Sequence, residues 1–193
     1  CSPSGSVSST TSTDDDVASV SAAIEGSEMN ASATELASQS MKPASVAEVN
    51  GAVGAQVEFP EDEFGGIKAV FIAATDSDPE RAAIIYDDGD IVVRIMKLDA
   101  AGAIDYVTDL DDEPGFAPWV KVVSVQGYEG RAHEKLDVPA EWDERGVAKP
   151  GTGVSTGAAT VMWSQGVYVV TVSSGEKGIA DLLRCAGEIR LSE

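Results

Sequence analysis

Two runs of β-branched residues separated by a short acidic turn constrain the fold of this chain most strongly. Segment 82–96 reads AAIIYDDGDIVVRIM, and its Asp88-Gly89 pair favours the positive φ angles of a type I′ turn. This pattern predicts an antiparallel hairpin. A second hairpin is predicted where ATVMW (159–163) and VYVVTV (167–172) flank Ser164-Gln165-Gly166. Adjacent hairpins need no crossover helix, so we expect an antiparallel sheet.

Helices are predicted at both ends of this strand-rich region. Ser45 and Glu48 have the spacing of a capping box, and Gly54 is a suitable stop, so Val46 to Val53 should form a short helix. A helix that covers the sheet is predicted near the C-terminus by the apolar residues Ile179, Leu182, Leu183, Ala186 and Ile189. Further strands are expected at 55–59, 67–74, 119–125 and 128–132. The fold class is therefore α+β. No helix or strand is predicted in the polar, acidic segment 97–118.

Composition divides the chain into two parts. Residues 1–42 hold 12 Ser, 4 Thr, no aromatic residue and one basic residue. Such a segment buries too little apolar surface to offset the entropy of ordering, so we interpret it as a disordered tether. A flexible coil of this length has a root-mean-square reach of roughly 35 Å. Residues 43–193 form the predicted single domain, which is long enough to bury a core without disulfides.

Charge and hydropathy argue against a nucleic-acid partner and against a membrane-spanning helix. The chain has 33 acidic and 13 basic residues, a net charge of -20, and no local basic patch that would attract phosphates. We therefore expect no nucleic-acid partner. The longest apolar run, Ala69 to Ala74, is far shorter than the roughly 20 residues of a membrane-spanning helix.

Four segments together resemble a known family: SVAEVNGAVGAQVEFP, IIYDDGDIVVRIMK, ATVMWSQGVYVVTVSS and GIADLLRCAGEI. They are similar to a domain of unknown function found in secreted proteins and lipoproteins of Gram-positive gut bacteria, with related domains on anti-sigma-type membrane proteins. The resemblance covers most of residues 44–191 and implies packing roles for Pro60, Tyr86, Trp163 and Tyr168. It implies an extracytoplasmic location and this fold, and it transfers no catalytic or ligand-binding residue.

The two cysteines have different expected roles. Cys1 followed by SPSGSVSSTTSTDDD resembles a mature bacterial lipoprotein, in which the N-terminal cysteine carries the lipid and a Ser-rich spacer follows. We therefore expect lipid attachment at Cys1 and anchoring to the bacterial cell membrane; the alternative is a chance thiol. Cys185 lies beside the apolar stripe of the last predicted helix, which is typical of a buried small hydrophobe.

The motifs that suggest catalysis have structural explanations. Gly153 to Gly157 matches the G-x-S-x-G pattern of hydrolases, but a strand rather than a helix should follow, and the single histidine, His133, comes earlier. We read that segment as a flexible loop. Ser174 and Lys177 have S-x-x-K spacing, which a helix cap formed by Ser173 and Glu176 explains. We expect no cofactor and no catalytic residue.

Acidic runs raise the question of a metal. None of them has the spacing of an EF-hand loop, and one histidine with two distant cysteines cannot form a zinc site. We therefore expect no bound metal. Should calcium bind, Asp109, Asp111 and Glu113 are the best-placed ligands.

One loop offers a surface for a partner. Trp142 lies with Glu141 and Arg145 in the long mixed-charge segment 133–157, and an aromatic side chain on a loop is a common anchor in protein interfaces. The alternative is that Trp142 covers the open end of the sheet. The sequence thus predicts a lipid-anchored, extracytoplasmic binding or sensing domain without catalysis, whose ligand or envelope partner is unknown. A cell-envelope hydrolase that uses acidic residues and a structural or adhesive component are the alternatives.

Overall fold

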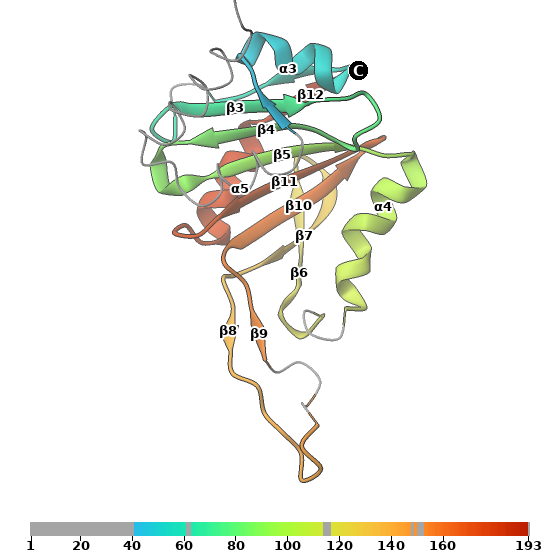
Figure 1. Cartoon of the computed structure of the whole chain (residues 1–193), viewed down its shortest axis with the longest axis vertical. Helices are drawn as coiled ribbons and strands as arrows, with labels where there is room; N and C mark the ends of the chain where they lie inside the picture. Colours follow the sequence, from blue (N-terminus) through green and yellow to red (C-terminus); the bar gives the residue numbers. More distant parts are fainter. Residues whose placement is uncertain (1–40, 61–62, 114–116, 148, 150–152, 193) are drawn as a thin grey trace, which may run out of the picture.

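The computed structural model describes residues 41–60, 63–113, 117–147, 149 and 153–192. Its centre is an eight-stranded sheet with the order β1-β3-β4-β5-β11-β10-β7-β6, in which every neighbouring pair is antiparallel (Figure 1). The bounds of these strands are β1 Met41–Pro43, β3 Ile67–Ala73, β4 Glu80–Tyr86, β5 Val92–Lys97, β6 Lys121–Val125, β7 Tyr128–His133, β10 Ala159–Gln165 and β11 Tyr168–Ser174. The predicted α+β class with an antiparallel sheet is confirmed.

Both predicted hairpins lie in the middle of this sheet. β10 and β11 pair from Ala159↔Ser174 to Gln165↔Tyr168, and Gly166 in the turn has φ +61°. The β4–β5 hairpin also forms, but its turn differs from the predicted type I′ turn. Residues Asp88–Asp90 make a short 3-10 turn, and the left-handed conformation falls on Asp90, with φ +50°.

Helices α3 (Val46–Val53) and α5 (Ile179–Glu188) share one face of the sheet. α3 has the predicted bounds: Glu48 accepts a hydrogen bond from the Ser45 N–H at 2.8 Å, and Gly54 ends the helix with φ +75°. α5 contacts β10 and β11, so the prediction that the last helix covers the sheet is confirmed. The largest cluster of buried side chains lies between these helices and the sheet, and it includes Trp163, Tyr86, Ile84, Leu182 and Val53.

The start of α5 differs from its prediction. Its N-cap is Gly178, and the first N–H of the helix, on Ile179, donates to the carboxylate of Glu134 at 3.2 Å. The Ser174 hydroxyl instead accepts from the N–H groups of Glu176 and Lys177, just before the helix. The predicted cap by Ser173 and Glu176 is therefore wrong, because a carboxylate distant in sequence takes its place.

Two small sheets complete the fold. β2 (Gln56–Glu58), shorter than the predicted strand 55–59, pairs with β12 (Arg190–Ser192), a strand that the sequence did not indicate. β8 (Asp137–Val138) pairs with β9 (Val154–Ser155) and forms the stem of a projection from the sheet (Figure 1). We call the described part of this projection, residues 134–147, 149 and 153–158, the arm. At its base, the Thr156 hydroxyl accepts from the Leu136 N–H at 2.8 Å.

Met41 and Lys42, which were predicted to belong to the disordered tether, form part of strand β1, so the assignment of these two residues is wrong. β1 begins at Met41, which pairs with Ala73 of β3 and is buried. The rest of the predicted tether, with Cys1, lies outside the described residues.

Candidate functional site

A helix that the sequence did not predict stands on the second face of the sheet. α4 (Ala100–Thr108) begins after Asp99, whose carboxylate accepts from the Gly102 N–H at 2.7 Å. Its buried residues Ala103 and Val107 pack on Met162 of β10 and Val169 of β11. The assignment of no element to segment 97–118 is therefore wrong.

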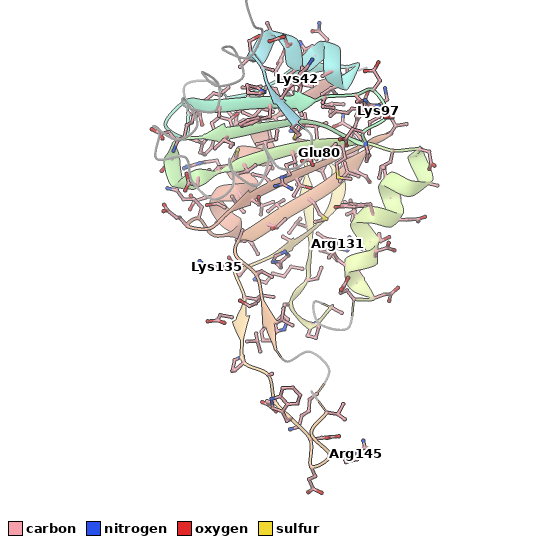
Figure 2. The ribbon with its side chains drawn as sticks, in the orientation of Figure 1. Lys42, Glu80, Lys97, Arg131, Lys135 and Arg145 are labelled. Atoms are coloured by element: carbon pink, nitrogen blue, oxygen red, sulfur yellow. The ribbon has the colours of Figure 1, made fainter. Side chains whose placement is uncertain are left out.

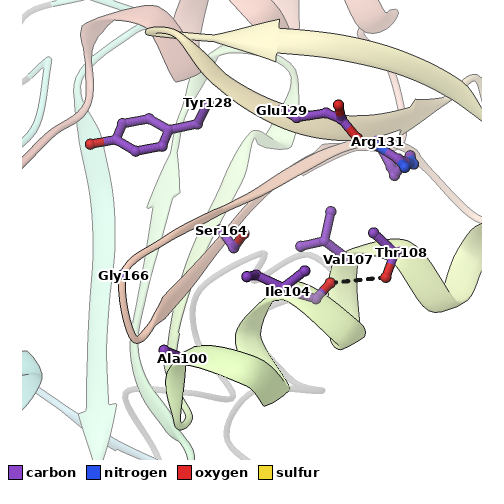
Figure 3. A pocket seen from close by; sticks show the side chains of 9 residues that line it. All are labelled: Ala100, Ile104, Val107, Thr108, Tyr128, Glu129, Arg131, Ser164 and Gly166. Carbon is purple, nitrogen blue, oxygen red and sulfur yellow. Dashed lines mark hydrogen bonds and ion pairs between the residues drawn. The ribbon is translucent and has the colours of Figure 1, made fainter.

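A hollow of about 430 Å³ separates α4 from β7 and from the β10–β11 turn. We call it the α4–β7 hollow. It is lined by Ala100, Ile104, Val107, Thr108, Tyr128, Glu129, Arg131, Ser164 and Gly166. In Figure 3, Ile104 and Val107 line its α4 side, and Tyr128 and Glu129 lie on the β7 side. Apolar walls with a few polar groups are typical of a binding site.

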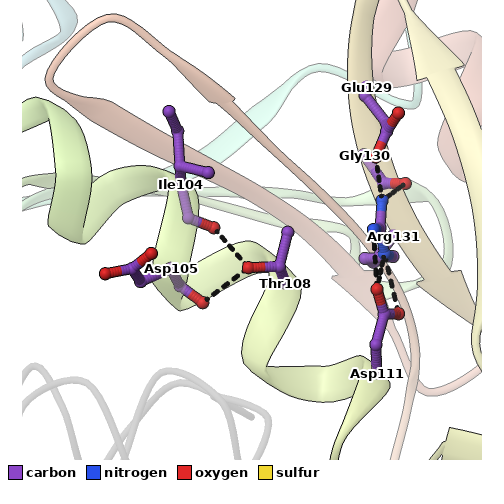
Figure 4. A network of polar contacts seen from close by, with 7 residues as sticks. All are labelled: Ile104, Asp105, Thr108, Asp111, Glu129, Gly130 and Arg131. Carbon is purple, nitrogen blue, oxygen red and sulfur yellow. Dashed lines mark hydrogen bonds and ion pairs between the residues drawn. The ribbon is translucent and has the colours of Figure 1, made fainter.

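An ion-paired arginine lies at one end of this hollow. The Arg131 side chain is 7% exposed, and its guanidinium contacts the Asp111 carboxylate at 2.6 Å and that of Glu129 at 2.9 Å (Figure 4). The hydrogen bonds from Arg131 lower the pKa of Asp111, and both carboxylates raise the pKa of Arg131 despite its burial. Because Asp111 follows α4 and Arg131 lies on β7, the pair fastens the end of the helix to the sheet.

A second hollow, of about 580 Å³, lies on the other flank of α4. We call it the α4–β5 hollow. Tyr106 and Met162 border it and also border an adjoining hollow of about 240 Å³ that reaches Asp109 and Glu113. On its sheet side, Arg94 contacts Glu80 at 3.5 Å. The helix is thus flanked by hollows on both sides.

The arm presents the residues predicted to bind a partner. Trp142 is 64% exposed, so it does not cover the open end of the sheet. Glu141 contacts Lys149 at 3.0 Å, and Arg145 contacts Asp143 at 3.2 Å. Figure 2 places Arg145 at the far end of the arm and Arg131 beside α4. The three predicted residues therefore share one region, well apart from the hollows.

Asp143 organises the turn next to Trp142. Its carboxylate accepts from the N–H groups of Arg145 at 2.8 Å and Val147 at 2.9 Å, and its own N–H donates to the Val147 carbonyl at 2.8 Å. The hydrogen bonds from Val147 and then Arg145 lower the pKa of Asp143. Trp142 is consequently presented by a turn with a defined backbone conformation.

The three predicted calcium ligands have different surroundings in the structure. Asp111 is held by Arg131, whereas Asp109 and Glu113 border the hollow next to Tyr106. Within the described ranges, no group of three or more acidic, histidine or cysteine side chains is arranged to hold a metal ion.

The serine motif and the histidine occupy structural positions. Val154 and Ser155 of the G-x-S-x-G segment form β9 and pair with β8, so the interpretation of that segment as a flexible loop is wrong for these two residues. His133 is buried at the end of β7, where Nδ1 lies 3.0 Å from the Glu134 carbonyl oxygen.

Cys185 is buried in the main core, and burial raises the pKa of its thiol from 9.0 to about 12. Because the pKa of the thiol is higher in the folded state than in the unfolded state, ionisation of Cys185 favours the unfolded chain. The stability associated with the protonated thiol is therefore fully present below pH 9 and is lost as the pH rises toward 12. At about pH 10.5 we expect roughly 2 kcal/mol less stability from this group than at pH 8. Urea unfolding at both pH values measures it. A Cys185→Ala variant is the control, and an equal alkaline loss in that variant would contradict the assignment.

Sequence reasoning missed Arg131, Ile104, Tyr106 and Tyr128. The available signals for α4 were the N-cap residue Asp99 and the four-residue spacing of Ala103 and Val107. The ion pair had no local signal, because its partners lie 20 residues apart.

Comparisons with known proteins returned no matching family model, no similar curated protein and no similar solved structure. The family resemblance of the sequence therefore stays a prediction. Among the helices of the described ranges, none is long and apolar enough to cross a bilayer.

Proposed function

We propose that this protein is a non-catalytic binding protein of the cell exterior, anchored to the membrane by a lipid on Cys1, and that the arm contacts its partner. The Cys1 motif and the Ser-rich segment that follows it support the anchor. The negative net charge argues against polyanionic partners. A protein or another surface component outside the membrane is the partner class that fits best.

The observation that carries this proposal is the presentation of Trp142. A large aromatic side chain, 64% exposed, stands beside a turn that Asp143 organises through two hydrogen bonds to its carboxylate and one from its backbone N–H. Tryptophan is enriched among the residues that dominate binding energy. A preorganised turn also lowers the entropy lost on association. Both properties favour a contact surface over a passive loop.

Two of the carboxylates beside the hollows are held by arginine side chains, which favours binding over catalysis at these two positions. Glu129 is ion-paired with Arg131, and Glu80 with Arg94. The Asp78 carboxylate accepts from the Glu80 N–H at 3.1 Å. A hydrolase that works with two carboxylates needs one as a proton donor and the other as a base or nucleophile. Glu129 and Glu80 each already bind an arginine side chain, so either catalytic role would require that ion pair to break.

The anchor is tested by mass spectrometry of the protein from its native membrane. We expect an acylated N-terminal cysteine at Cys1. A longer, unmodified N-terminus would refute the anchor and would leave the role of the arm open to a separate test.

The arm is tested by photo-crosslinking on native cells, with benzoylphenylalanine at Glu144, an exposed position near Trp142. We expect a discrete adduct whose yield falls at least ten-fold in Trp142→Ala, because truncation of a central aromatic anchor weakens binding by about that factor or more. Val122→Ala, which alters an exposed side chain of β6, is the matched control. An adduct that Trp142→Ala leaves unchanged would overturn the role of this residue.

A further inference from the structure

The two flanks of α4 each carry one large apolar side chain that is not buried in the core. Ile104 is 55% exposed and Tyr106 is 44% exposed, and they flank the stripe of Ala103 and Val107 that is buried against the sheet. Ile104 borders the α4–β7 hollow and Tyr106 borders the α4–β5 hollow. Single exposed apolar residues are ordinary. Here each of the two stands at the rim of a hollow large enough to receive a side chain.

The chain segment that contains α4 carries charge of one sign. Residues 98–119 contain six acidic residues and no basic residue. Of the six, the described structure pairs Asp111 with a cation, Arg131. Asp109 and Asp112 follow the C-terminal end of α4, where the helix dipole is already negative and where its last turn holds no basic residue. Carboxylates at that end destabilise the helix unless a cation approaches them.

We propose that α4 and the hollows on its two flanks form a docking surface for a basic, amphipathic segment of a partner protein. Apolar side chains of that segment would enter the hollows beside Ile104 and Tyr106. Its lysines or arginines would pair with Asp109 and Glu113, which border the hollow next to Tyr106. Charge complementarity selects this occupant, because an acidic segment would meet the carboxylates of Asp109 and Glu113, for which the described residues supply no ion pair. This surface is separate from the arm.

The probe is a synthetic helical peptide of leucine and lysine with one apolar face, titrated onto the full chain by calorimetry. One comparison peptide replaces each lysine by glutamate, and another replaces each leucine by serine. We expect the leucine–lysine peptide to bind, and both comparison peptides to bind at least ten-fold more weakly. Equal binding of the lysine–serine peptide would overturn the proposal, because it would show only general attraction to a chain of charge -20.

Substitutions at and away from α4 test where the peptide binds. We expect Ile104→Ser/Tyr106→Ser to weaken the leucine–lysine peptide at least ten-fold, while Val122→Ser/Val147→Ser, also at exposed apolar positions, leaves its affinity unchanged. Asp109→Asn/Glu113→Gln should weaken binding and reduce its dependence on salt. Asp76→Asn/Glu144→Gln removes the same charge at exposed positions elsewhere and serves as its control. Equal effects of a variant pair and its control would refute the site.

The arm proposal has an independent outcome. Trp142→Ala should leave the affinity of the peptide unchanged, because the arm projects away from α4 (Figure 1). A loss of peptide binding in Trp142→Ala would place the peptide on the arm and would overturn the α4 surface.

Discussion

Gly130→Ala should destabilise the protein by about 3 kcal/mol, at the upper end of what overpacking in a well-packed interior costs. Gly130 lies in the middle of β7, between Val123 of β6 and Trp163 of β10. A Cβ atom there would stand 2.5 Å from the Met162 carbonyl oxygen and 3.1 Å from the Trp163 Cβ atom. The nearer obstacle is backbone, which cannot rotate away, so β7 and β10 would have to separate.

The matched control is the same substitution in α3. Gly51 is a helical residue, and the described part of the chain places no atom within 4 Å of an added Cβ, apart from those of its chain neighbours and its own helix backbone. Alanine in a helix is more favourable than glycine by about 1 kcal/mol, so Gly51→Ala should stabilise the protein. Urea unfolding of both variants measures the change in unfolding free energy, which should be a loss for Gly130→Ala and a gain for Gly51→Ala. If Gly130→Ala were neutral, the close β7–β10 approach would be wrong.

The sequence predicted the elements whose signals are local. The β10–β11 hairpin follows from two apolar runs around a turn that ends in Gly166, and α3 follows from the Ser45–Glu48 box and Gly54. In both cases the residues that decide the structure lie within a few positions of one another. Binary pattern and turn chemistry are sufficient for such segments.

The sequence could not predict contacts that only the assembled sheet creates. β2 and β12 pair through Val57 and Leu191, which are far apart in the chain, and each strand is only three residues long. α4 buries just Ala103 and Val107, too few apolar residues for a clear helical pattern. The constraint on Gly130 comes from a carbonyl oxygen of another strand.

The two candidate surfaces also differ in whether local sequence patterns predict them. Trp142 was predicted because an aromatic residue in a charged loop is visible in the sequence. The hollows beside α4 needed both the position of the helix and the register of β7 against β10, neither of which local patterns determine.

Asp111→Ala should destabilise the protein by about 2 kcal/mol. Removing one partner of a fully buried ion pair costs about 3–5 kcal/mol because the other charge stays buried. The Arg131 side chain is 7% exposed, but that of Asp111 is 41% exposed, so water can reach the vacated position and the expected loss is smaller. Glu129→Gln is the control: its side chain is 69% exposed, and we expect a loss below about 1 kcal/mol.

Arg131→Met separates the burial of charge from the loss of the contact. Methionine retains an apolar stem of similar length and leaves no buried charge, so this variant should lose less stability than Asp111→Ala, within about 1 kcal/mol of the parent. In the Arg131→Met background, Asp111→Ala should then have little further effect. Urea unfolding of the four proteins gives the coupling energy, and additive losses would contradict a direct pair.

The same pair predicts a pH dependence. Because Arg131 lowers the folded-state pKa of Asp111, its stabilisation is present above the unfolded pKa of about 4 and is lost as the pH falls through the folded value. The difference in unfolding free energy between the parent and Asp111→Ala should therefore shrink in acid. Hydrogen exchange of the α4 amides should report the same change, because the pair fastens the end of α4 to β7. Unchanged α4 protection in Asp111→Ala would mean that Ala103 and Val107 hold the helix without the ion pair.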